Sequence, residues 1–188
     1  MDIKLPLRIF SVDPATTKSG WSVLELISIN PLKIKVLKHG QIDGQKLLTR
    51  NKEMTKIFQK QFCVLDALEQ EYVSLIEEYQ PDIVVSESAF GYTHMSALIA
   101  LTLAIDTLRR ASKRVRGKDI TLVAPTLSKK AATGSGVADK LKMREAYLNT
   151  TYLEKIGTEL SEHEIDAIFH GIAYVKIYIT HELVVNKK

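Results

Sequence analysis

The chain has 188 residues, of which 45% are hydrophobic and 26% charged, the ordinary range for a globular domain. This composition excludes intrinsic disorder, collagen-like repeats and disulfide-stapled miniproteins, and the length suits one domain with a sizeable core. The 26 Lys and Arg residues against 22 Asp and Glu give a net charge of +4. Such a mild excess favours a polyanionic partner only if the basic residues gather on one face.

Cys63 is the only cysteine, so no intramolecular disulfide can form and a reducing, intracellular setting is expected. Residues 1–10 are too short and too charged for a signal peptide. The longest apolar run, residues 97–108, is shorter than the roughly 18 residues that a membrane span needs. We therefore predict a cytoplasmic protein without a membrane anchor.

The N-terminal part of the chain predicts three consecutive strands. Residues 7–12 form an apolar, branched run that stops at Asp13, because the following Pro14 cannot donate the next ladder hydrogen bond. Residues 21–29 and 32–42 follow, separated by a turn, and the second of these runs alternates apolar residues with lysines. We expect these three strands to form a meander.

The middle of the chain predicts two helices around a short strand. From Asn51 to Pro81 apolar residues recur at spacings of three and four, typical of an amphipathic helix. Residues 82–86 form an apolar burst, typical of a strand buried on both faces. Residues 93–112 are again helical and apolar on more than one side. We expect this helix to form a homodimer interface; a central position within a monomer is the alternative.

A strand and three helices are predicted in the remaining chain, at residues 120–123, 125–132, 139–153 and 161–183. Thr126 could cap the first of these helices, and Ser161 and Glu164 have the spacing of a capping box at the start of the last one. Antiparallel strands followed by alternating units imply an α/β fold with a mixed five-stranded sheet and helices on both faces.

Three acids stand where the predicted fold could form a site. Asp13 and Glu87 each follow a buried strand directly, and the carboxyl ends of strands line the crevice of an open α/β sheet. Asp166 follows His163 by three residues, so both side chains lie on one helical face. Carboxylate and imidazole ligands are typical of a site for Mg²⁺ or Mn²⁺, and not of a zinc site built from thiolates. The set is similar to a two-metal site for phosphodiester hydrolysis.

Most of these residues also have a purely structural interpretation. Asp13 could be a turn residue, His163 a solvated residue of the first helical turn, and Asp166 a partner of the helix dipole. Glu87 differs, because a carboxylate among apolar neighbours is costly to bury without a partner or an ion.

Basic residues surround a glycine turn in the C-terminal half. Lys129 and Lys130 precede Gly134 and Gly136, and Lys140 follows them. Backbone amides freed by glycine beside ammonium groups can cradle a phosphate. The alternatives are a flexible turn and a solvated basic helix face.

Two further features could serve nucleic-acid binding. Basic residues are frequent over 109–118, where pairing with the helix dipole and solubility are the alternative explanations. Phe90 lies just beyond Glu87, and it could be a core aromatic or, on an exposed loop, a residue that stacks on or wedges beside a base.

Four segments, IFSVDPATTKSGWSVLE, PDIVVSESAF, KKAATGSGVADK and HEIDAIFHGIA, resemble in order and spacing the motifs of the RuvC-type Holliday junction resolvases, which belong to the ribonuclease H-like (retroviral integrase) superfamily. The resemblance implies one RuvC-like nuclease domain over residues 1–188 with a ribonuclease H-like fold. It also implies a crossover junction endodeoxyribonuclease, acting as a homodimer in DNA recombination, repair or the processing of replication intermediates. Each subunit would nick one of two symmetric strands of a four-way DNA junction, in a bacterial or phage-infected cell or an organelle.

The resemblance implies a metal site at Asp13, Glu87, His163 and Asp166, holding two Mg²⁺ or Mn²⁺ ions for in-line attack of water on the phosphodiester. The family has Asp or His at the position of His163, which is implied to be a ligand or a general base.

The resemblance further implies phosphate contacts. Lys129 and Lys140 match the two basic positions that flank the glycine loop, with Lys140 beside the reacting phosphate, and Lys130, Gly134 and Gly136 would contact the DNA backbone. Phe90 matches the aromatic residue three positions after the catalytic Glu. Ala15 stands where the family has glycine after Asp-Pro.

Three other functions remain to be weighed against this one. The segment VDPATTKSGWSV also resembles the first phosphate loop of the actin-like kinase and ATPase fold, which needs a second such domain, so no nucleotide cofactor is expected. A non-catalytic junction-binding protein would keep the basic runs but would not need the acids. A broader nuclease for flaps and forks is the remaining alternative.

Overall fold

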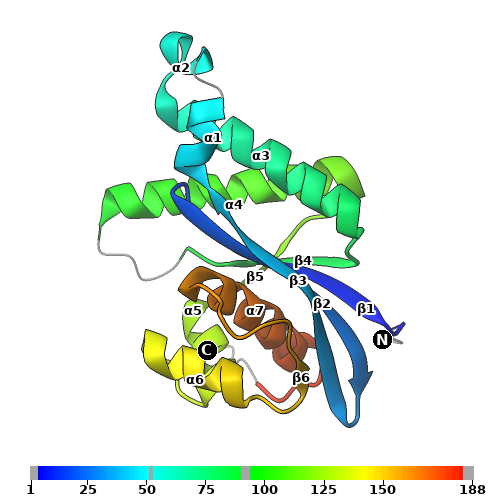
Figure 1. The fold of residues 1–188 in the computed structure, drawn as a ribbon. Coiled ribbons are helices and arrows are strands. Elements are labelled where there is room, and N and C mark those ends of the chain that lie inside the picture. Colours follow the sequence, from blue (N-terminus) through cyan, green and yellow to red (C-terminus); the bar gives the residue numbers. More distant parts are fainter. Residues whose placement is uncertain (1–3, 51–52, 90–93, 184–188) are drawn as a thin grey trace.

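The computed structural model describes residues 4–50, 53–89 and 94–183. One mixed sheet crosses this part of the molecule in the order β5-β4-β1-β2-β3-β6, with helices on both of its faces (Figure 1). The predicted α/β class with a helix layer on each face is therefore confirmed. The main strands are β1 (Leu7–Asp13), β2 (Lys18–Ile29), β3 (Leu32–Asp43), β4 (Ile83–Glu87) and β5 (Thr121–Val123).

The predicted meander is confirmed, because β1 pairs with β2 and β2 with β3 in antiparallel register. β4 then pairs in parallel with β1, and β5 in parallel with β4. The carboxyl ends of β1, β4 and β5 consequently meet at one edge of the sheet. This edge is where the two strand-end acids were predicted.

The expectation of five strands is wrong, because the described residues form a six-stranded sheet. The additional strand, β6 (Leu153–Glu154), pairs in parallel with β3. The predicted helix over 139–153 is shorter: α6 (Lys140–Asn149) ends at Thr150, which has an extended backbone. A strand of two residues is too short to show an alternating pattern, so only its pairing with β3 defines it.

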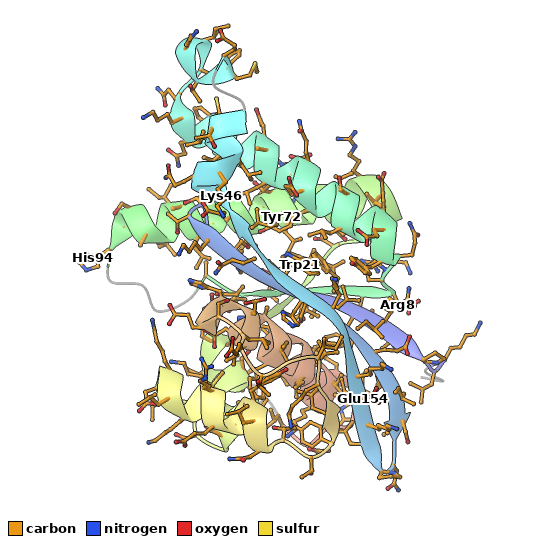
Figure 2. The ribbon with its side chains drawn as sticks, viewed as in Figure 1. Arg8, Trp21, Lys46, Tyr72, His94 and Glu154 are labelled. Carbon is orange, nitrogen blue, oxygen red and sulfur yellow. The ribbon has the colours of Figure 1, made fainter. Side chains whose placement is uncertain are left out.

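The helices divide between the two faces of the sheet (Figure 1). α3 and α4 pack on one hydrophobic cluster, and α5, α6 and α7 pack on the other. Tyr72 of α3, labelled in Figure 2, points toward the sheet and is fully buried. Its hydroxyl lies 2.7 Å from Ser19 Oγ on β2. The bounds of these helices are α3 (Lys60–Tyr79), α4 (Met95–Arg116), α5 (Pro125–Thr133) and α7 (Glu162–Tyr174).

The single helix predicted from residue 51 to 81 is broken in the structure. α1 (Gly44–Arg50) and α2 (Met54–Ile57) precede α3, and the backbone between α2 and α3 is extended. α2 has no buried residue, and Ile57 is 74% exposed. Because helices in proteins depend on packing of their apolar face, the spacing in this segment does not produce one continuous helix beyond the edge of the sheet.

Two helices of the C-terminal half, α5 and α7, differ from the sequence prediction at their ends. α5 begins after Ala124 with Pro125 in its first turn, so Thr126 is inside the helix and is not its cap. Pro125 suits the first turn because its missing N–H has no partner there in any helix. The capping box of Ser161 and Glu164 is confirmed, and α7 continues into a π-helical segment, η1 (Val175–Ile179).

Within the described ranges, none of the helices combines the length and the hydropathy that crossing a membrane requires.

Candidate functional site

Asp13 and Glu87 are the last residues of two neighbouring parallel strands. Their predecessors, Val12 and Ser86, are paired in the β1–β4 register. Side chains alternate along a strand, so Asp13 shares a face with Ile9, which packs in the cluster under α7. Glu87 lies by the same alternation on the α7 side of β4. The strand ends thus bring two carboxylates together beneath one helix.

Glycines allow α7 to approach the sheet at this point. Gly20 is paired with Asp13, and a Cβ on Gly20 would lie 2.1 Å from the carbonyl oxygen of His163. A Cβ on Gly171 would lie 2.8 Å from Ser11 Oγ on β1. A larger residue at either position would push the helix away from the strands. The two glycines therefore set the height of α7 above the carboxylates.

His163 in the first turn of α7 contacts Asp13 directly. Its Nδ1 lies 2.8 Å from Asp13 Oδ2, and because an ionised carboxylate only accepts, Nδ1–H donates. This hydrogen bond raises the pKa of His163 above its ordinary value. Burial alone would raise the pKa of Asp13, but the bond from His163 and the nearby His170 outweigh it, and the pKa of Asp13 is lowered.

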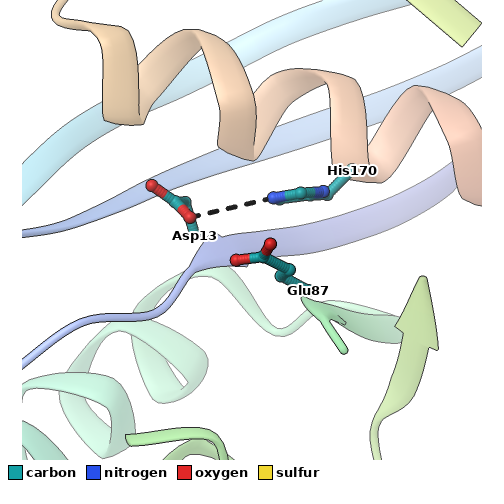
Figure 3. A group of neighbouring side chains, drawn as sticks. All are labelled: Asp13, Glu87 and His170. Atoms are coloured by element: carbon teal, nitrogen blue, oxygen red, sulfur yellow. Dashed lines mark ion pairs between the residues drawn. The ribbon is translucent and has the colours of Figure 1, made fainter. Parts of the chain in front are cut away.

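Asp166 and His170 follow on the next turns of the same helical face. His170 is only 3% exposed, and its Nε2 lies 3.9 Å from Asp13 Oδ1 (Figure 3). Its other ring nitrogen, Nδ1, lies 2.7 Å from Ser128 Oγ on α5. Burial and the charge of Asp13 raise the pKa of Asp166. The pKa of His170 is also raised: burial opposes the shift, but contacts with Asp13 and Glu87 outweigh it.

Glu87 has a strongly perturbed carboxyl group. The residue is 9% exposed, and burial, the largest cause, raises its pKa from 4.5 to about 7. The neighbouring charges of Asp13 and Asp166 add to this rise. Several acids held together against their electrostatic repulsion are an arrangement that a bound cation would stabilise.

These groups line an open cleft of about 400 Å³. Six of the ten residues predicted for the site lie around it, namely Asp13, Glu87, Lys129, Lys140, His163 and Asp166. Lys140 is exposed and forms an ion pair with Glu162. This pair raises the pKa of Lys140 and lowers that of Glu162.

The other predicted residues do not line the cleft in the part of the chain that the structure describes. Lys130 is exposed on α5, one position beyond the cleft-lining Lys129. Gly134 is the C-terminal cap of α5, where its positive φ of 80° favours glycine, and Gly136 packs near Thr126. Phe90 lies outside the described residues.

Sequence reasoning missed three polar residues of the cleft, Ser128, Glu162 and His170, and two apolar ones, Pro125 and Met143. The signal for His170 is present in the sequence, because it follows Asp166 by four positions and His163 by seven, the spacing of one helical face. Ser128 had no comparable signal. Its contact with His170 depends on how α5 packs against α7.

The second basic run is engaged in ion pairs. Arg109 and Lys113 pair with Asp119, and Arg110 pairs with Glu69 of α3. The helix that carries them packs on the face of the sheet opposite to α7. Because this helix lies on the face away from the acidic cleft, its basic residues are not placed to contact a phosphate bound in that cleft.

The acidic cluster has the ligands of a cation site. One atom each from Asp13, Glu87 and His170 lies within 4.8 Å of the other two. The Nε2 atom of His170 is buried and has no hydrogen-bond partner among the described residues. Carboxylate oxygens and an imidazole nitrogen are common ligands of divalent cations, so these residues fit a metal ion.

Carboxylates at the ends of two parallel strands, beside a cleft with lysines at its rim, define a class of site suited to metal-dependent phosphodiester chemistry.

A scan against protein-family models finds no match. RuvC of Clavibacter michiganensis subsp. michiganensis, a crossover junction endodeoxyribonuclease, is 24% identical over 152 residues, which cover 81% of this chain and 68% of that protein. RuvC of Thermosipho melanesiensis is 27% identical over 152 residues, covering 80% of this chain and 86% of that protein.

A comparison of the fold with solved structures also finds RuvC. The structure of T. thermophilus RuvC in complex with a Holliday junction substrate superposes with a TM-score of 0.73 at 16% identity, covering 94% of this chain and 96% of that one. The ribonuclease H-like fold predicted from the motifs is therefore confirmed. The chain is similar to the RuvC-type resolvases in sequence and in fold.

Proposed function

We propose that this chain is a structure-selective endodeoxyribonuclease that resolves four-way DNA junctions by metal-dependent nicking of two symmetric strands. The observation that carries the proposal is the convergence of Asp13, Glu87 and Asp166 in one cleft whose rim carries Lys129 and Lys140. Its RuvC relatives, named as crossover junction endonucleases, support the same substrate. Residues 1–188 would form one nuclease domain acting where its DNA is, in the cytoplasm of a bacterial or phage-infected cell.

The carboxylates Asp13, Glu87 and Asp166, with His163, would hold Mg²⁺ or Mn²⁺, two ions per site. A bound cation supplies Lewis-acid chemistry: it polarises the phosphodiester and lowers the pKa of the attacking water. His163 holds a proton at Nδ1 against Asp13, which leaves its Nε2 able to bind a cation or to accept a proton in its neutral form. The residue therefore suits either the ligand or the base role.

Lys129 and Lys140 would position the phosphate. Lys140 is exposed and ion-paired with Glu162. A phosphate that enters the cleft can therefore replace Glu162 as the partner of the Lys140 ammonium group without a large desolvation cost. Glu162 also lies 3.8 Å from His163 Nε2. The carboxylate that a phosphate displaces from Lys140 would therefore stay close to the reacting centre. The exchange of a carboxylate for a phosphate would couple DNA binding to the arrangement of the site.

A homodimer would place two such sites on one junction, because symmetric nicking needs two active sites related by a twofold axis. Helix α4 supports this arrangement: Leu101, Ala104 and Leu108 are buried within the subunit, whereas Met95 is 70% and Ile99 50% exposed. Sedimentation is the test. Monomers alone at micromolar concentration, with and without junction DNA, would contradict the dimer.

The decisive experiment compares a synthetic four-way junction, a flap, a fork and a linear duplex, each with Mg²⁺ or Mn²⁺. Paired nicks at symmetric positions in the junction alone support the proposal. Equal cutting of flaps and forks would favour the broader nuclease. Junction binding without cutting in either metal would favour the non-catalytic alternative, and Asp13→Asn serves as the matched binding control.

A further inference from the structure

His170 of α7 lies at the buried floor of the site, beside Asp13 and on the helix side of the carboxylates (Figure 3). It is 3% exposed, and its Nε2 atom is buried without a hydrogen-bond partner among the described residues. This nitrogen faces Asp13 and Glu87, and it lies 3.9 Å from Asp13 Oδ1, beyond hydrogen-bond distance (Figure 3). A buried polar atom without a partner is costly. Because this nitrogen points toward two carboxylates, a cation held by them would supply the missing partner.

The opposite side of the imidazole is held by Ser128 of α5. The Ser128 hydroxyl lies 2.7 Å from His170 Nδ1, and both groups are buried. When Nδ1–H donates to this hydroxyl, the lone pair of the neutral ring lies on Nε2 and points at the carboxylates. Histidines that bind metals are oriented in this way, with the other ring nitrogen hydrogen-bonded to a neighbouring group.

We propose that His170 Nε2 is a nitrogen ligand of a divalent cation that Asp13 and Glu87 also hold, and that Ser128 orients it for this role. The proposal deepens the proposed nuclease function and shares its cation site. The floor of the site would then offer nitrogen as well as oxygen. Because Mg²⁺ strongly prefers oxygen ligands whereas Mn²⁺ also binds imidazole nitrogen, the site would select Mn²⁺ over Mg²⁺.

The spacing of the three groups fits this role. Ligand atoms 2.0–2.1 Å from an octahedral cation lie about 3 Å apart when adjacent and about 4 Å apart when opposite. The distance of 3.9 Å between His170 Nε2 and Asp13 Oδ1 is within this span. The three atoms of the cluster lie within 4.8 Å of one another, so small side-chain movements suffice to bring them around one ion.

The same geometry also fits a competing role for His170, that of a buried counter-cation that neutralises the carboxylates. The two roles predict changes of opposite sign. A ligand that is removed weakens metal binding, whereas a competing positive charge that is removed strengthens it. The affinity for a cation therefore distinguishes them.

The experiment measures Mn²⁺ and Mg²⁺ binding to the protein without DNA, by titration calorimetry. His170→Asn is the most specific variant, because the asparagine amide can still form a hydrogen bond with Ser128 but has no atom at the Nε2 position. We expect at least about a tenfold loss of Mn²⁺ affinity, a smaller loss for Mg²⁺, and about a tenfold loss of Mn²⁺ affinity for Ser128→Ala. His94→Asn is the control, since that imidazole is exposed at the start of α4, and it should change neither affinity. Unchanged or increased Mn²⁺ affinity in folded His170→Asn would overturn the proposal.

Electron spin echo spectroscopy of bound Mn²⁺ supplies a readout that does not depend on affinity. His163→Asp removes the other imidazole of the cleft, so any nitrogen coupling that remains in this variant comes from His170. We expect the coupling to persist in His163→Asp and to disappear when His170→Asn is added. A missing nitrogen coupling in Mn²⁺-loaded His163→Asp would refute the proposed ligand.

These outcomes are separable from the nuclease proposal. Nitrogen coupling from His170 in a protein that cuts no junction would contradict the proposed function and leave this inference intact. Junction cleavage with Mn²⁺ bound only through oxygen would do the reverse.

Discussion

Replacing Glu87 with glutamine should stabilise the protein at alkaline pH and abolish its cleavage activity. The side chain is 9% exposed at the end of β4, and burial raises its pKa from the ordinary 4.5 to about 7. Glutamine has nearly the same shape and carries no charge to bury. The substitution would remove a proposed metal ligand together with the cost of keeping that ligand ionised.

The magnitude follows from the shift in pKa. At about 1.36 kcal/mol for each pH unit, the displacement of the Glu87 pKa corresponds to about 3 kcal/mol. The folded protein binds the proton of Glu87 more tightly than the unfolded chain does. The contribution of this proton to the free energy of unfolding is therefore fully present below about pH 4.5 and is lost as the pH rises through about 7. We therefore expect Glu87→Gln to match the wild type near pH 4.5 and to exceed it by about 3 kcal/mol at pH 8.5, a gain of about 6–12 °C in Tm.

The assay is thermal and urea unfolding in a chelator, at both pH values, for the wild type, Glu87→Gln and Glu162→Gln. Glu162 belongs to the same cleft but is exposed, so its variant should change the free energy of unfolding by less than about 1 kcal/mol at either pH. Adding Mn²⁺ at pH 8.5 should stabilise the wild type more than Glu87→Gln. A Glu87→Gln protein less stable than the wild type at pH 8.5, or a difference that does not change with pH, would refute the reasoning.

Three further predictions concern the other groups of the cleft. Asp166→Asn should lose cleavage but keep metal-free junction binding in a gel-shift assay, because phosphate affinity comes from basic residues; nicking at a rate near that of the wild type would contradict its role. Lys129→Ala should slow cleavage of every junction sequence alike and flatten the salt dependence, whereas Lys130→Ala, outside the cleft, should only weaken binding; equal loss of the cleavage rate in both would argue against a specific role for Lys129. His163→Asp should keep substantial activity. Because the contact with Asp13 raises the pKa of His163, the wild-type rate should rise with pH around a midpoint above 6.5, and His163→Asp should lack this rise; an identical profile would exclude the imidazole as its source.

The sequence identifies the residues whose chemistry is unusual for their place. Glu87 at the end of an apolar strand, and Asp166 three positions after His163, are visible without coordinates because alternation and helical spacing are local properties. The parallel pairing of β1 and β4 then brings the strand-end acids together, as strand order in this fold class leads one to expect.

The extent of the helices was less predictable. The apolar spacing between residues 51 and 62 resembles that of the rest of α3, but Phe58 and Phe62 remain more than half exposed. Spacing indicates which side of a helix would be apolar, and it does not indicate whether anything lies opposite that side. The break before α3 depends on the position of the sheet edge.

Local sequence thus determined the strands that carry Asp13 and Glu87, the capping box that starts α7, and the motifs that resemble those of RuvC-type resolvases, since each depends on neighbours a few positions away. Only the tertiary structure decided the floor of the site. His170 reaches the carboxylates because Gly20 and Gly171 let α7 lie close to the strands, and Ser128 meets its ring because α5 packs beside α7. These contacts join residues up to 157 positions apart, between Asp13 and His170, and their distances depend on packing between elements that no local pattern encodes.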